Sequence, residues 1–177
     1  MRSQGAGSAA AAPRSAVCAR LSHGRLASLT AFVLGAASVA GFAPLYLFPL
    51  PLATLAVLML QWDAAEMPRR AARLGWYFGL GYFLTGVSWV YVSLHNFGAM
   101  PAPIAAFFTL LFCAYLALFP AAAGYLAARL PVGAPAKYSL LVPAAWALLE
   151  WLRGWLFTGF PWLALGYSQV PSSPLAG

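Results

Sequence analysis

Long apolar runs separated by short polar segments dominate this chain. An α-helix rises about 1.5 Å per residue, so about 20 apolar residues cross the roughly 30 Å hydrocarbon core of a bilayer. Five runs approach or exceed that length, and they cover about 26–42, 45–61, 74–94, 103–130 and 138–157. The pattern predicts an all-α polytopic membrane protein, with about five transmembrane helices forming a bundle over residues 26–157.

Small residues and prolines refine this prediction. Gly75 and Gly79 have GxxxG spacing, which favours close packing of the third helix against a neighbour. The fourth run is longer than a bilayer requires and contains Pro120, so we expect a kink there. Between the second and third runs, the charged segment 61–73 is predicted to be a polar loop.

Composition and charge exclude other classes. The 177 residues are 63% hydrophobic and 7% charged, whereas soluble domains have about 25% charged residues. The net charge is +7, but the basic residues fall between apolar runs, which argues against nucleic acid as a partner. Cys18 lies in the N-terminal tail and Cys113 in an apolar run, and the two histidines, His23 and His95, are far apart, so no disulfide, metal site or cofactor is predicted. Cys113 is expected to be a small buried hydrophobe.

The basic residues also predict a topology. Residues 1–25 have the composition of a disordered basic cytoplasmic tail, although a transit peptide or signal sequence is the alternative. A cytoplasmic N-terminus places nine of the ten basic residues inside, and Arg153 alone outside. Lys and Arg are enriched in cytoplasmic segments, so this orientation is predicted. It places the turns at Pro44 and at 95–101, and all of 153–177, on the outer face.

The segment Glu150–Gln169 combines charge with aromatic residues at the end of the fifth run. At about 100° per residue, Glu150 and Arg153 share one side of the helix with Trp146, and Trp151 and Trp155 lie opposite. The spacing predicts an ion pair between Glu150 and Arg153. The tryptophans then act as headgroup anchors; alternatively, these side chains line a cavity that faces a lipid substrate. The candidate lipid-facing residues are Glu150, Arg153, Trp151, Trp155, Trp162 and His95.

The alternative interpretation of His95 is as the capping residue of a turn beside Asn96. No activated nucleophile with an acid or base partner can be assembled from the visible pattern.

Three motifs resemble the apolipoprotein N-acyltransferase family of bacterial inner membranes. They are GFAP at 41–44, GVSWVYVSLHNFGAMP at 86–101 and EWLRGWLFTGFPWLALGYSQ at 150–169. The resemblance implies a multi-pass inner-membrane enzyme with a periplasmic nitrilase-like domain. It also implies transfer of an acyl chain from a phospholipid to the α-amino group of the diacylglyceryl-cysteine that begins a lipoprotein. The implied partners are the phospholipid donor, the lipoprotein N-terminus and membrane lipid.

In that family a Cys thiolate forms a thioester, with Glu and Lys partners in the nitrilase-like domain. Cys18, Cys113 and Glu150 do not match those residues, so we expect no catalytic residue in this chain. We therefore expect an inactive N-terminal fragment without the nitrilase-like α/β domain, in which periplasmic segment 158–177 leads to a missing remainder. The alternatives are a non-enzymatic membrane scaffold or transporter subunit, or the membrane anchor of a polyprenol-mannose synthase.

Overall fold

The computed structural model describes residues 24–170 and 174, and within these residues all regular structure is helical. Residues 1–23 of the expected tail lie outside the described part; Gly24 and Arg25 begin the first helix. The elements are α2 (Gly24–Ser38), η1 (Val39–Gly41), α3 (Pro49–Asp63), α4 (Pro68–Gly86), α5 (Trp89–Val92), η2 (Ser93–Phe97), α6 (Ala102–Leu116), α7 (Leu118–Arg129), α8 (Ala134–Ala136), η3 (Lys137–Leu141), α9 (Val142–Arg153), η4 (Leu156–Thr158) and η5 (Leu165–Ser168).

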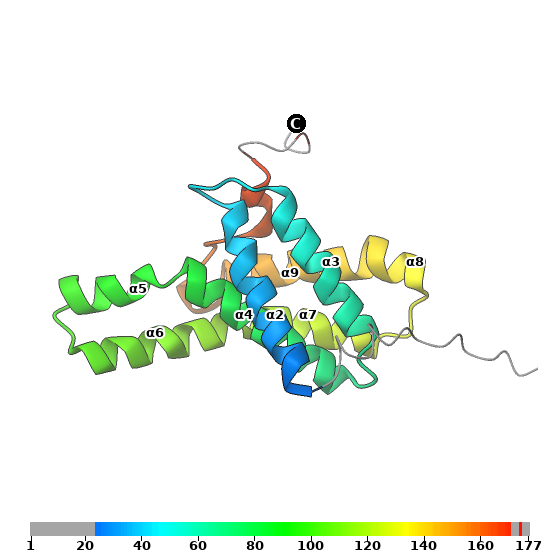
Figure 1. Cartoon of the computed structure of the whole chain (residues 1–177), viewed down its shortest axis with the longest axis horizontal. Coiled ribbons are helices and arrows are strands. Elements are labelled where there is room, and N and C mark those ends of the chain that lie inside the picture. The colour runs from blue at the N-terminus through cyan, green and yellow to red at the C-terminus, as the bar shows by residue number, and fades with distance from the viewer. Residues whose placement is uncertain (1–23, 171–173, 175–177) are drawn as a thin grey trace, which may run out of the picture.

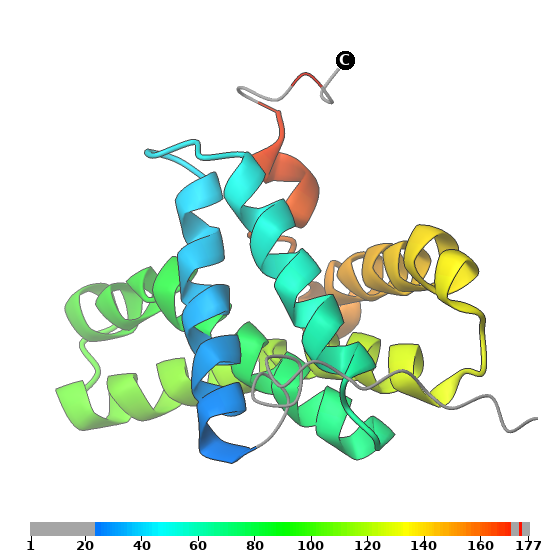
Figure 2. The same ribbon diagram turned by 45° about the vertical axis from the view of Figure 1, so that its right-hand side comes forward.

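The helices cross one another steeply. Helices α2 and α3 form an upright hairpin, and α6 and α7 run across behind it (Figures 1 and 2). Helix α4 lies between these layers, because it packs against α2 on one side and α7 on the other. Helix α9 packs on α7, and the segment after α9 rises toward the start of α3 (Figure 2).

Glycines bring α4 close to both neighbours. A Cβ on Gly81 would lie 2.0 Å from the carbonyl oxygen of Phe32 in α2, and one on Gly75 would lie 2.4 Å from that of Pro120 in α7. A Cβ on Gly79 would lie 2.8 Å from Cα of Ala117. Only glycine permits such backbone approach. The predicted close packing at the GxxxG pair is therefore confirmed.

Prolines set two helix boundaries. The fourth apolar run is divided at Ala117, between α6 and α7, three residues before Pro120. Pro120 has no N–H to donate to the preceding turn, so the predicted kink is confirmed. The predicted polar loop at 61–73 is wrong in extent. Helix α3 continues to Asp63 and α4 begins at Pro68, because proline is favoured at the first position of a helix.

Much of the apolar surface faces outward. The stretches 24–41 and 102–129 are long and apolar enough to cross a bilayer. In their most apolar 18 residues, only 28% and 33% of the positions are buried. Phe97 is 85% exposed, and large apolar side chains cover the outer surface of α6. Apolar surface of this extent is typical of a membrane or protein contact, and among the described residues these two stretches alone, of the five predicted spans, have the length and apolar composition to cross a bilayer. The observed architecture is thus an all-helical assembly with membrane-type helices.

Candidate functional site around the end of α9

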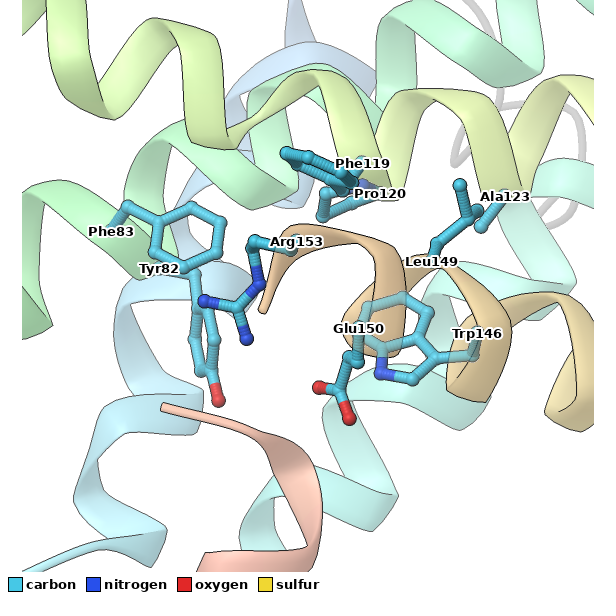
Figure 3. A pocket seen from close by; sticks show the side chains of 9 residues that line it. All are labelled: Tyr82, Phe83, Phe119, Pro120, Ala123, Trp146, Leu149, Glu150 and Arg153. Carbon is cyan, nitrogen blue, oxygen red and sulfur yellow. The ribbon is translucent and has the colours of Figure 1, made fainter. Parts of the chain in front are cut away.

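Helix α9 separates a buried face from an exposed face at its C-terminal end. Arg153 is 2% exposed and Glu150 is half-buried, whereas Trp151 and Trp155 are 61% and 71% exposed. The indole of Trp146 lies beside Glu150 on the inner face (Figure 3). The predicted division of this helix into a polar side and a tryptophan side is confirmed.

The predicted ion pair between Glu150 and Arg153 is wrong. Nη1 of Arg153 donates to the carbonyl oxygens of Phe160 and Trp162, at 3.1 and 2.6 Å. Oε1 of Glu150 accepts the backbone N–H of Leu165 at 2.9 Å. Helical spacing placed the two charges correctly, but the chain after α9 turns back and supplies backbone partners to both. Buried charged groups require such hydrogen bonds.

Tyr82 of α4 completes this arrangement. Its hydroxyl donates to the carbonyl oxygen of Leu163 at 3.0 Å, and its ring is 4% exposed. We call Tyr82, Glu150 and Arg153 the polar clasp. Together they bind the backbone of residues 160–165, and the Arg153 guanidinium also lies 5.2 Å from the centre of the Phe83 ring.

Local backbone geometry allows the chain to turn back over the clasp. Phe157, Thr158 and Gly159 all have positive φ, at 50°, 73° and 82°. The N–H of Phe160 then donates to the carbonyl oxygen of Arg153 at 2.9 Å. A Cβ on Gly159 would lie 2.0 Å from the carbonyl oxygen of Gly154, so the reversal requires glycine at that position.

Two further contacts attach the segment to the hairpin and to α4. The side chain of Leu163 is 8% exposed and packs over Gly86, where an added Cβ would lie 2.3 Å from its methyl carbon. Nε2 of Gln169 donates to the carbonyl oxygen of Phe48 at 3.0 Å. The segment after α9 is therefore bound to α3, α4 and α9 at once.

The clasp borders a small cavity. Its volume is about 20 Å³, close to the space that one water molecule needs. Glu150 and Arg153 line it together with aromatic and apolar side chains (Figure 3). Glu150 also borders an apolar groove of about 390 Å³ between α3 and α9. Of these two spaces beside Glu150, only the groove has the dimensions of a ligand site.

The remaining candidates lie apart from the clasp cavity. The ring of Trp162 lies 5.7 Å from that of Trp89, and it borders a groove of about 510 Å³. The ring centroids of Trp151 in α9 and of Trp155, two residues beyond its end, lie 6.0 Å apart, and both side chains are exposed. Nδ1 of His95 is hydrogen-bonded to the carbonyl oxygen of Met100 at 2.8 Å, so His95 caps the turn before α6.

Classical catalytic groups are sparse among residues 24–170. No three His, Cys, Asp or Glu side chains in this range are placed to hold a metal ion. Cys113 is a free thiol with no exposed surface, as predicted for a buried hydrophobe. The clasp binds backbone, and it presents no nucleophile beside a base.

Sequence reasoning did not identify Tyr82 as part of this site. Tyr82 lies 68 positions before Glu150 in an aromatic-rich run, where nothing in the pattern separates it from its neighbours. The acceptors of Arg153 are backbone carbonyls, which every residue has. Glycine at position 159 was the one available signal of a chain reversal.

The fold and site define a helical membrane module whose last segment is bound back onto its own helices. Residues 34–177 match the model of the apolipoprotein N-acyltransferase N-terminal domain. The apolipoprotein N-acyltransferase of Nitrosomonas europaea is 52% identical over 155 residues, which are 88% of this chain and 31% of the relative. That of Chromobacterium violaceum is 48% identical over 84% of this chain and 28% of the relative.

The chain therefore belongs to the apolipoprotein N-acyltransferase family. It spans about three tenths of the length of these relatives. The family assignment favours the acyltransferase interpretation over a transporter subunit or an unrelated scaffold.

Proposed function

We propose that this chain is the membrane-embedded part of an enzyme that acylates lipoproteins in the bacterial inner membrane. The reaction would move an acyl chain from a phospholipid to the α-amino group of a lipoprotein's N-terminal diacylglyceryl-cysteine. The observation that carries this proposal is the match of residues 34–177 to the N-terminal domain of the family. The relatives' name, with its transfer of an acyl group to a lipoprotein amine, supports the substrate class.

The proposed topology is multi-pass, with five spans and a cytoplasmic N-terminus. Its orientation depends on the distribution of basic residues, and two tertiary contacts support the grouping of segments on common sides. Nζ of Lys137 lies 3.0 Å from Oδ1 of Asp63, which joins two segments that the proposal places inside. The Gln169 amide binds the carbonyl of Phe48, which joins two segments that it places outside. Both contacts would be forbidden if their partners lay on opposite sides of a bilayer.

The segment Glu150–Gln169 would form a wall of the entrance for lipid on the outer face. The polar clasp fixes its backbone, while Trp151, Trp155 and Trp162 keep more than half of their surface exposed. Tryptophan favours the headgroup level of a bilayer. In this proposal Glu150 and Arg153 are positioning residues and the tryptophans contact lipid. His95 would lie on the same outer face, as the cap of its turn.

The chemistry would come from a nitrilase-like domain of the whole enzyme. Cys113 is enclosed in the helical core and has no described acid or base partner, so it cannot attack an ester. We therefore expect no turnover when the purified 177-residue chain is mixed with phospholipid and a diacylated lipopeptide. The measurement is mass spectrometry of the lipopeptide, with the Nitrosomonas europaea relative as the positive control. Acyl transfer by the 177-residue chain would contradict this assignment.

The topology can be tested by thiol labelling. Phe97 is 85% exposed and lies in a segment placed outside, and Gly133 lies in a loop placed inside with nothing within 4 Å of an added Cβ. In a Cys18→Ser background, Phe97→Cys should react with a membrane-impermeant maleimide in intact spheroplasts. Gly133→Cys should react only after permeabilisation. The opposite pattern would reverse the orientation, and equal labelling of both would exclude the span between them.

A further inference from the structure

Helices α2 and α4 enclose a groove of about 680 Å³ that the acyltransferase proposal does not use. Its described lining consists of Gly24, Arg25, Ser28, Leu29, Phe32, Arg73, Tyr77 and Leu80. The volume lies in the range of small-ligand sites. The lining includes two arginines and no acidic side chain.

The polar and apolar residues of this groove are separated along its length. Helices α2 and α4 both begin at the same end of the molecule and run in the same direction (Figures 1 and 2). Arg25 lies in the first turn of α2, and Arg73 lies near the start of α4. Phe32 and Leu80 each follow their arginine by seven residues, which is about 10 Å farther along the helix. The groove therefore has a cationic mouth and an apolar interior.

Both arginines are available to a ligand. Their side chains are exposed, and among the described residues neither makes a hydrogen bond or an ion pair. Asp63, the acid that ends α3, is occupied by Lys137 at 3.0 Å. Each guanidinium has a fork of N–H donors that can bind phosphate oxygens, and both arginines line the same groove.

We propose that this groove binds one phospholipid with an anionic headgroup. Arg25 and Arg73 would bind the phosphate, and an acyl chain would lie along Leu29, Tyr77 and Leu80. Charge complementarity selects this occupant. A zwitterionic headgroup carries an ammonium group, which the two arginines at the mouth of the groove would repel. The outward face of α2 beside the groove is apolar, with Leu26, Leu29 and Val33 each more than half exposed. A lipid could therefore enter sideways from the bilayer.

Binding to dioctanoyl-phosphatidylglycerol tests this site in the full chain in detergent micelles, measured by native mass spectrometry. We expect one saturable lipid, with dioctanoyl-phosphatidylcholine at least tenfold weaker and no competition from inorganic phosphate. The Arg25→Gln/Arg73→Gln variant should bind phosphatidylglycerol on the order of thirtyfold more weakly, because each arginine near an anionic lipid contributes about fivefold.

The matched control is Arg69→Gln/Arg129→Gln, which removes the same charge at two exposed arginines outside the lining. It should change affinity less than twofold. A second variant, Ser28→Trp, fills the groove and keeps both arginines, and it should also abolish the saturable site. Equal loss in the control variant, full binding by Ser28→Trp, or equal affinity for phosphatidylcholine would each overturn the proposal.

Discussion

Replacing Arg153 by Met should destabilise this protein more than replacing any exposed arginine. Arg153 is 2% exposed, and its Nη1 donates hydrogen bonds to the carbonyl oxygens of Phe160 and Trp162. Hydrogen bonds from charged groups contribute about 1.5–3 kcal/mol each. Removal of the unfavourable desolvation of a buried cation offsets part of this loss. However, the Glu150 carboxylate would then lose its nearby cation, so we expect a net loss of about 3 kcal/mol.

The measurement is thermal unfolding in detergent micelles. A loss of about 3 kcal/mol corresponds to a midpoint lower by about 10 °C for a chain of this size. Arg129→Met is the matched control, because Arg129 is exposed and should leave the midpoint within about 1 °C. Tyr82→Phe, which removes one neutral hydrogen bond to the same segment, should cost only about 1 kcal/mol. An unchanged midpoint for Arg153→Met would show that the polar clasp does not stabilise the fold.

Gly81→Ala should separate α2 from α4. The new Cβ would lie 2.0 Å from the carbonyl oxygen of Phe32 and 2.9 Å from its carbonyl carbon, so the backbone of one helix must move. Alanine favours a helix over glycine by about 1 kcal/mol. Overpacking against a backbone costs about 1–3 kcal/mol, and more when the neighbour cannot yield. The steric cost should win, with a net loss of about 2 kcal/mol or more.

Urea unfolding of the same variant in micelles provides the readout. Gly133→Ala is the control, because nothing lies within 4 Å of the added Cβ and Gly133 has no positive φ. It should leave the midpoint unchanged or slightly raise it. A stabilised Gly81→Ala protein would mean that helix propensity outweighs packing, and that α2 and α4 are farther apart than described.

The broad architecture follows from local rules that the sequence displays. Apolar runs predicted helices, Gly75 and Gly79 predicted a close helix contact, and Pro120 predicted a break. Each depends on residues within one or two turns. The predicted extent of the loop at 61–73 was wrong because it followed from the charged residues alone. Pro68 starts helix α4, and the arginines that follow it are helical.

The site required information that helical spacing does not contain. Glu150 and Arg153 lie on one side of α9 as predicted, but their partners depend on where residues 160–165 go. That path depends on a reversal at 157–159 and on Tyr82, which lies 68 residues before Glu150 in the chain. The sequence prediction paired Glu150 with Arg153 because they are the nearest opposite charges. In the structure both side chains bind backbone groups instead.

The glycines of α4 also bear on changes of chain length. Helix α4 has no side chain at Gly75 and Gly79, where α7 approaches its backbone, or at Gly81, where α2 approaches it. A one-residue insertion early in α4 would rotate everything beyond it by about 100°, so that Phe78 and Leu80 would take the places of Gly79 and Gly81 at these contacts. Insertions and deletions should therefore be tolerated in the segment 64–67 before α4 and in the loop 130–133, but not between Leu74 and Tyr82.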